Sequence, residues 1–278
     1  MVEATAEAVS SVIRRNNITL AGRPDGPVMM LAHGFGCDQD MWRKLLPYFA
    51  NDYRLVLFDH VGSGNSDAAA YDRDKYSTLD GYAADMLEIC ESLKLEEVIL
   101  VGHSVSAMMA VIAAAREPRR FRHLVLVAPS PRYTNDPDDG YVGGFSREDI
   151  EGLLESLDSN YFAWAAALAP MVMGNPEEPD LAEDLRSSFC RTNPSIARHF
   201  ARVTFLSDSR AVLGEVHTGC LILQCSDDAL APPVVGSYLH SHLESSVLVH
   251  LEATGHCPHV SAPEATARAI RDYLTGCP

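Results

Sequence analysis

The chain has 278 residues, of which 47% are hydrophobic and 22% are charged, and its formal net charge is −16. This composition is typical of a globular protein with one large core, or with a core and a cap. The negative charge argues against nucleic acid and anionic membrane surfaces as partners, because it repels phosphate groups.

The first residues, MVEATAEAVSSVIRRNN, have neither a basic start nor an apolar stretch, so we do not expect a secretory signal. The seven cysteines are odd in number and irregularly spaced, and they include no C-x-x-C pair. This usage is typical of reduced thiols and predicts a cytoplasmic protein. The stretch SSVIRRNNITLAG (residues 10–22) is interpreted as a hairpin that turns at Asn16 and Asn17, which predicts antiparallel first strands.

Six compact apolar runs with little period-two alternation follow along the chain. They are VMMLAH (28–33), RLVLFD (54–59), EVILVG (97–102), HLVLVA (123–128), CLILQC (220–225) and SVLVHL (246–251). Such runs are typical of strands buried on both faces of a parallel sheet. Helical patterns lie between or after them, at residues 78–93, 106–118 and 263–274. This alternation predicts an α/β fold with helices on both faces of a parallel sheet.

The alternation stops between Ser130 and Gly219, a distance far longer than an ordinary connection. Four helical patterns separated by Gly and Pro lie there, at residues 146–157, 161–173, 180–190 and 193–206. We therefore expect a helical lid, residues 131–218, inserted into a core made of residues 1–130 and 219–278.

Ser104 lies in VGHSVSAMMA, after a predicted strand and before a predicted helix. This context is the one in which a hydrolase places its nucleophile on a tight turn of pattern G-x-S-x-G. Ser106 replaces the second Gly, and the alternative is a chance match in a buried segment. The turn would expose the hydroxyl at the carboxyl edge of the sheet, above a helix N-terminus that favours negative charge.

A serine nucleophile needs a histidine base and an acid that orients it, in the chain order Ser, Asp or Glu, His. The candidate base is His256 in LEATGHCPH, just after the last predicted strand, with His259 as the competitor. A metal site made of His256, Cys257 and His259 is the weaker interpretation, because no other ligand-spaced cluster exists. Asp227 and Asp228 both follow the preceding strand; only one can face the histidine, and we favour Asp228.

The backbone N–H groups that stabilise the negative charge of the reaction are also expected at strand ends. One belongs to Val105, directly after the nucleophile, and the other to Phe35 in HGFG (33–36), where glycines allow close approach to a substrate. Together these features predict a serine hydrolase.

The segments HGFGCDQDMW, GHSVSAM, SPRYTND, NYFAWA, ILQCSDDALAP and TGHCPH together resemble the RsbQ-type α/β-hydrolases, from about Arg14 to Leu274. This group contains a bacterial stress-response regulator and the plant karrikin and strigolactone receptors. The resemblance implies about eight strands, a lid of four helices, and Ser104, Asp228 and His256 as the catalytic triad. It places the oxyanion donors on Phe35 and Val105, and it implies no cofactor and no metal. It also implies a pocket lined by Phe35, Tyr133, Phe145, Trp164 and Phe205.

An apolar pocket with one polar cluster suits a small hydrophobic ester or lactone. The resemblance implies a slow or specialised hydrolase that acts in stress signalling with a PAS-domain PP2C-type phosphatase. The alternative is an ordinary metabolic carboxylesterase or lactonase without a protein partner. Dehalogenation is disfavoured because the turn holds Ser104 where that chemistry needs Asp, and the intact triad argues against a protein that only binds its ligand.

Overall fold

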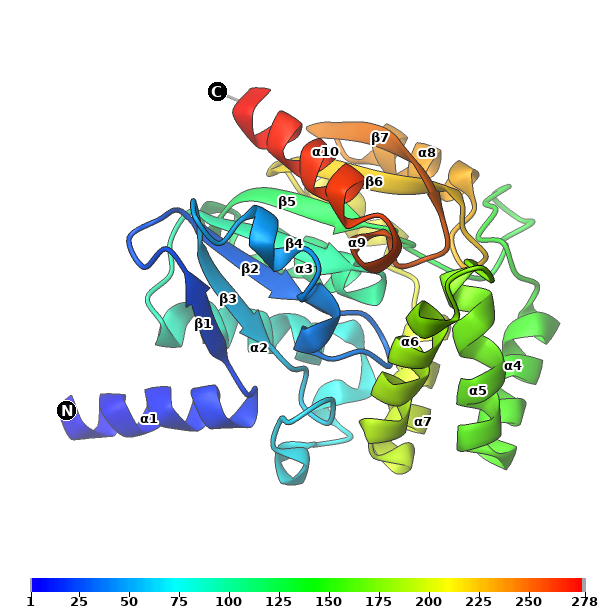
Figure 1. The fold of residues 1–278 in the computed structure, drawn as a ribbon, viewed down its shortest axis with the longest axis horizontal. Coiled ribbons are helices and arrows are strands. Elements are labelled where there is room, and N and C mark those ends of the chain that lie inside the picture. Colours follow the sequence, from blue (N-terminus) through cyan, green and yellow to red (C-terminus); the bar gives the residue numbers. More distant parts are fainter. Residues whose placement is uncertain (1, 277–278) are drawn as a thin grey trace.

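The computed structural model describes residues 2–276. Its strands form one seven-stranded sheet with the order β1-β3-β2-β4-β5-β6-β7 (Figure 1). The only antiparallel pair among the described strands is β1 with β3, and the other neighbours run parallel. The strands are β1 (Thr19–Gly22), β2 (Val28–Ala32), β3 (Arg54–Phe58), β4 (Val98–His103), β5 (Phe121–Val127), β6 (Gly219–Asp227) and β7 (Ser246–Thr254). The α/β-hydrolase fold expected from the sequence is confirmed, with seven strands where about eight were expected.

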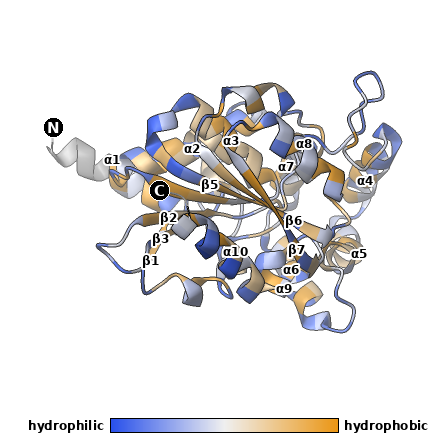
Figure 2. Ribbon diagram, turned by 90° about the horizontal axis from the view of Figure 1, so that it is seen from above, coloured by the Kyte–Doolittle hydropathy of each residue, from blue (hydrophilic) through white to orange (hydrophobic). Residues whose placement is uncertain are grey.

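Helices cover both faces of the sheet and form two apolar layers (Figure 2). On one face lie α2 (Leu79–Ser92), α3 (Val105–Arg116) and α8 (Pro233–His242), whose apolar side chains pack on Met30, Val56 and Leu100. On the other face α10 (Pro263–Gly276) packs with Trp42 against the strands, next to the short α9 (Pro258–Ser261). Every residue of β4 is buried, as the continuous apolar run VILVGH predicts for a central strand.

The predicted hairpin at residues 10–22 is wrong in its first half. Residues up to Arg15 belong to a helix, α1 (Val2–Arg15), and the chain turns at Asn17, which has a φ of 46°, into β1. The Ala- and Glu-rich start, VEATAEAV, favours helix, and this propensity extends through SSVIRR. One expected strand is therefore a helix, although the first strand of the sheet is antiparallel as predicted.

Four helices lie between β5 and β6, where the four helical patterns of the sequence fall. They are α4 (Arg147–Ser159), α5 (Tyr161–Met173), α6 (Pro179–Arg191) and α7 (Pro194–Phe205). In Figure 1 they stand together beyond the carboxyl ends of the strands. Their inward side chains form an apolar cluster separate from the two layers of the sheet. The division of the chain into core and lid stays a prediction.

Within residues 2–276, no helix is long and apolar enough to cross a membrane.

Besides His256, four buried histidines lie at the carboxyl edge of the sheet, in two groups. The rings of His33 and His60 pack edge to face at 4.5 Å, and the His60 backbone N–H donates to His33 Nε2 over 3.0 Å. The His259 ring packs between those of His103 and Trp42, with centroids 4.4 Å away from each and interplanar angles of 58° and 37°. Burial lowers the pKa of all four, and it lowers the pKa of His259 to about 3.

We expect this protein to lose stability steeply below pH 6.5. In the unfolded chain these histidines take up protons near that pH, whereas the folded chain holds them neutral. Acid therefore favours the unfolded state, and stability falls as the pH drops through the unfolded pKa. For His259, whose folded pKa of about 3 lies well below this range, the loss from pH 7.5 to 5.5 is about 1.3 kcal/mol, and the other three histidines add to it in the same direction. Urea unfolding followed by tryptophan fluorescence at both values measures it.

The variant His259→Leu tests whether buried histidines cause the loss of stability in acid. The substitution breaks no hydrogen bond of the ring, because neither ring nitrogen of His259 has a partner. We expect it to remove about 1.3 kcal/mol of the acid loss between pH 7.5 and 5.5. His217→Leu, at a side chain that is 72% exposed, is the matched control and should leave the loss unchanged. An acid loss that is equal in the wild type and in His259→Leu would contradict the explanation.

Candidate active site

Ser104 stands on a strained turn between β4 and α3. Its φ of 57° and ψ of −125° lie outside the regions that side chains ordinarily allow, and its N–H is held by the Val127 carbonyl at 2.8 Å. Gly102 permits the turn, since a Cβ on it would lie 2.5 Å from the Ser106 carbonyl oxygen and 2.8 Å from the Ala107 nitrogen. This close approach explains why the residue two positions before Ser104 must lack a side chain.

Ser106, which replaces the usual second Gly, has a structural function. Its hydroxyl accepts a hydrogen bond from His60 Nε2 at 2.7 Å and donates one to the His33 carbonyl. The serine thereby links the helix after the turn to the loops that follow β2 and β3. The departure from G-x-S-x-G therefore adds buried hydrogen bonds without obstructing the turn.

Ser104, His256 and Asp228 form a continuous hydrogen-bonded chain, although they are far apart in the sequence. His256 Nε2 lies 2.7 Å from Ser104 Oγ, and His256 Nδ1 lies 2.8 Å from Asp228 Oδ2. The His256 and Asp228 side chains are 3% and 0% exposed. Nδ1 donates to the carboxylate, so Nε2 is free to accept the proton of the serine hydroxyl.

Each partner of Ser104 is held by its own loop. Asp228 Oδ1 accepts the N–H groups of Leu230 (2.8 Å) and Ala231 (3.2 Å), which fixes the carboxylate toward the histidine. Asp227, the other candidate acid, is exposed. His259, the other candidate base, packs in the Trp42 and His103 stack and has no hydrogen bond to Ser104.

The backbone of His256 is clamped between the sheet and α5. Its N–H donates to the Val172 carbonyl at 2.8 Å, and its own carbonyl lies 2.9 Å from His103 Nε2. The preceding Gly255 has a φ of 91°, and a Cβ there would come within 1.9 Å of the Met173 carbonyl oxygen. Glycine is therefore required for α5 to approach the loop that carries the histidine.

Two backbone N–H groups near Ser104 have no hydrogen-bond partner in the described residues. Among residues 2–276, neither the Val105 N–H, at the first turn of α3, nor the Phe35 N–H donates a hydrogen bond. Backbone donors inside a folded chain are almost always paired, so two free ones near Ser104 are notable. The Tyr133 hydroxyl lies 3.3 Å from Ser104 Oγ, and burial raises its pKa to about 12, which keeps it protonated and able to donate.

A small apolar cavity of about 30 Å³ opens onto Ser104 and His256. Of the five pocket residues expected, Phe35, Tyr133 and Phe205 line it, whereas Trp164 and Phe145 do not. Trp164 packs behind Phe35 with ring centroids 6.1 Å apart, and Phe145 packs at the edge of the same cluster. Phe189 of α6 and Phe205 of α7 narrow the cavity together with Phe35, so a ligand larger than a few atoms needs these rings to move.

Sequence reasoning missed part of the cavity wall. The additional lining residues are Cys37, His103, Leu168, Val172, Leu185, Phe189, Thr204, Leu230 and Cys257. Phe189 is the most intrusive, because a Cβ on Gly36 would lie 1.7 Å from its ring. Its position on the apolar stripe of α6 was a signal that it faces inward, but the sequence does not say what it faces.

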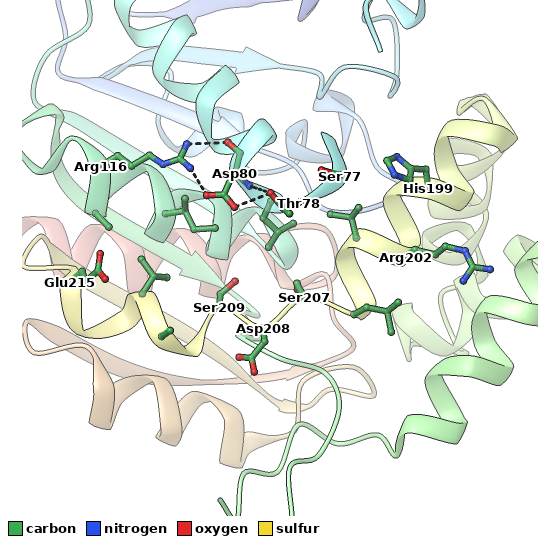
Figure 3. A pocket seen from close by; sticks show the side chains of 17 residues that line it. Ser77, Thr78, Asp80, Arg116, His199, Arg202, Ser207, Asp208, Ser209 and Glu215 are labelled. Carbon is green, nitrogen blue, oxygen red and sulfur yellow. Dashed lines mark hydrogen bonds and ion pairs between the residues drawn. The ribbon is translucent and has the colours of Figure 1, made fainter. Parts of the chain in front are cut away.

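A much larger hollow, about 780 Å³, lies away from Ser104 (Figure 3). It runs between the start of α2, the end of α3, α7 and the turn at Arg210–Glu215. Its charged side chains largely pair with protein groups; Arg116, for example, binds both the carbonyl and the carboxylate of Asp80. The size of a hollow therefore does not identify the candidate active site.

The described residues contain no cluster of three or more His, Cys, Asp or Glu side chains that could hold a metal ion.

Comparison with known proteins gives the family. Residues 27–263 match the model of the alpha/beta hydrolase fold family. A karrikin insensitive 2 receptor of Petunia hybrida is 40% identical over 93% of this chain and 95% of its own length. A strigolactone esterase of Arabidopsis thaliana is 38% identical over 95% of this chain and 98% of its own length.

The structure is also similar to that of a hydrolase from Oleispira antarctica. The TM-score is 0.93 with 41% identity, and the match covers 96% of this chain and 97% of the other. The resemblance inferred from the sequence motifs is confirmed by these relatives. The chain belongs to the α/β-hydrolase family, in the group that includes the karrikin and strigolactone receptors.

Proposed function

We propose that this chain is a serine hydrolase that cleaves esters or lactones of small hydrophobic compounds through an acyl-enzyme. The observation that carries the proposal is the buried hydrogen-bonded chain from Ser104 through His256 to Asp228. Esterases among the relatives support the reaction class, and the Arabidopsis relative is named a strigolactone esterase. No cofactor or metal enters the proposed reaction.

In the proposed reaction Ser104 Oγ attacks the carbonyl carbon while its proton passes to His256 Nε2. The N–H groups of Val105 and Phe35 donate to the oxygen that becomes negative, at the positive end of α3. His256 then gives the proton to the leaving alkoxide oxygen, which departs as an alcohol. A water, deprotonated by the same histidine, then attacks the acyl carbonyl; the bond to Ser104 Oγ breaks, Oγ takes the proton back from His256, and the carboxylic acid is released. Asp228 holds the ring and stabilises its positive charge.

The cavity supports a slow, selective enzyme. Its volume of about 30 Å³ leaves no room for a substrate until Phe35, Phe189 and Phe205 shift. Cleavage is therefore coupled to movement of the helices that cover the site, and we propose that these helices act as a lid. Such coupling suits a stress-signalling regulator whose partner, a PAS-domain PP2C-type phosphatase, reads the lid. The six free cysteines among residues 2–276 support a reducing, cytoplasmic setting, and Cys277 lies outside the described residues.

Removing the nucleophile tests the reaction. Ser104→Ala should lower the rate of p-nitrophenyl acetate hydrolysis by about 10³-fold or more, because the oxyanion donors alone give little turnover. The matched control is Ser106→Gly, which restores the usual motif and should keep the rate within about tenfold while losing about 1–3 kcal/mol of stability. Equal rates in Ser104→Ala and the wild type, with unchanged thermal melting, would refute the catalytic assignment.

Phe189→Ala tests the cavity. Removing the ring opens space beside Gly36 and Phe35, so we expect kcat/KM for the hexanoate ester to rise about tenfold relative to the acetate. The measurement is the ratio of kcat/KM for p-nitrophenyl hexanoate to kcat/KM for p-nitrophenyl acetate. This ratio does not depend on the fraction of active enzyme in each preparation. Phe145→Ala, outside the cavity wall, should leave the ratio unchanged. A ratio that moves equally in both variants would show that the cavity is not the acyl site.

The signalling half of the proposal needs its own test. The immobilised chain should retrieve a PAS-domain phosphatase from extracts of its native host, and Ser104→Ala loaded with an unreactive lactone analogue should show whether lid position changes the yield. Retrieval of no phosphatase under any stress condition, together with normal esterase rates, would favour the metabolic carboxylesterase. This outcome would refute the signalling role without refuting serine hydrolysis, so the two parts of the proposal are tested independently.

A further inference from the structure

The outward face of α5 is entirely apolar. Six side chains of this helix are exposed: Phe162, Ala163, Ala166, Ala167, Pro170 and Met171. Phe162 is 56% and Met171 46% exposed, and the helix sequence YFAWAAALAPMVM contains no charged residue. A surface helix normally has polar side chains on its outward face, as α4 does with Glu148, Glu151 and Glu155. An apolar face on a chain with a net charge of −16 therefore indicates a contact surface.

A groove of about 630 Å³ continues this face at the far end of the helix. Pro170 and Met171 of α5 form one wall, and Pro179 and Ala182 of α6 form the other. The two charged side chains at its edge neutralise each other, because Arg186 Nε lies 2.6 Å from Glu183 Oε2. The α5 face thus has a protruding ring at one end, small side chains in the middle and an uncharged groove at the other end.

We propose that α5 packs antiparallel against α5 of a second copy of this chain, across a two-fold axis near Ala166. Phe162 precedes Ala166 by four residues and Pro170 follows it by four, so each lies about 6 Å from the axis along the helix. The two-fold rotation then brings Phe162 of one copy to the groove beside Pro170 and Met171 of the other, and the reverse contact forms as well. This α5 contact is the self-complementary kind that a symmetric dimer requires.

Shape and charge favour a second copy as the occupant. Ala163, Ala166 and Ala167 let two helix backbones approach closely, and side chains spaced four residues apart form the ridges that interlock in the commonest class of helix packing. A copy also presents the same uncharged face, so the repulsion between two acidic molecules is not concentrated at the contact. Since Leu168 and Val172 on the opposite side of α5 line the cavity, the contact would hold one cavity wall in place.

Sedimentation velocity of the full chain, at concentrations from about 1 to 200 μM, tests the proposal. The contact is smaller than standard interfaces, so we expect half-dimerisation on the order of 10 μM and a stronger dimer at higher salt, where charge repulsion is screened. Phe162→Glu should weaken dimerisation at least about tenfold. Leu206→Glu, at a residue that is 50% exposed on another surface, is the matched control and should not change it. A chain that stays monomeric throughout would overturn the proposal.

Cross-linking tests the axis. Ala166→Cys should form an inter-chain disulfide under mild oxidation, because each copy brings the new thiol to the two-fold axis. Leu206→Cys, equally accessible, should form none, and circular dichroism confirms that each variant folds. A dimer that persists in Phe162→Glu while Ala166→Cys stays uncross-linked uses another surface and refutes the proposal. Capture of a different protein on the α5 face of a monomeric wild type would refute it too.

Discussion

The close packing of Gly102 against the first turn of α3 is the constraint on which the rest of the site depends. It allows β4 to turn directly into α3 through Ser104, whose φ of 57° is tolerated because strand and helix are both locked in the core. The same turn leaves the hydroxyl at the sheet edge and the Val105 N–H unpaired beside it. The proposed nucleophile and one proposed oxyanion donor thus follow from one backbone geometry.

The second constraint is the clamp on His256. Val172 on α5 holds its N–H, and His103, directly before the nucleophile, lies against its carbonyl. The position of His256 therefore depends both on the turn that carries Ser104 and on α5. Any shift of α5 therefore also acts on the loop that carries His256, because the Val172 carbonyl holds the N–H of that histidine. This hydrogen bond likewise links the apolar outer face of α5 to the chemistry within.

Burial of neutral histidines sets the conditions under which the site persists. His33 and His60 join the loops after β2 and β3 to Ser106, whereas His103 and His259 pack behind His256. Several of their ring nitrogens lack partners, so these rings act as much through packing as through hydrogen bonds. The site's architecture thereby depends on rings that must stay uncharged, and it is tied to a pH range in which they do.

The sequence by itself determined the fold class, the motif around Ser104 and the order of its partners, because buried strands and tight turns need particular residues at short range. It also indicated the four helices between β5 and β6. It favoured Asp228 over Asp227 and His256 over His259, but it could not show why, since burial and direction come from packing. Only the tertiary structure decided that Phe189 enters the cavity, that Trp164 and Phe145 do not line it, and that α5 exposes an uncharged face. Those features depend on which helix faces which, and contacts between distant segments leave no local pattern. At the chain start, helix propensity over VEATAEAV prevailed over the predicted hairpin.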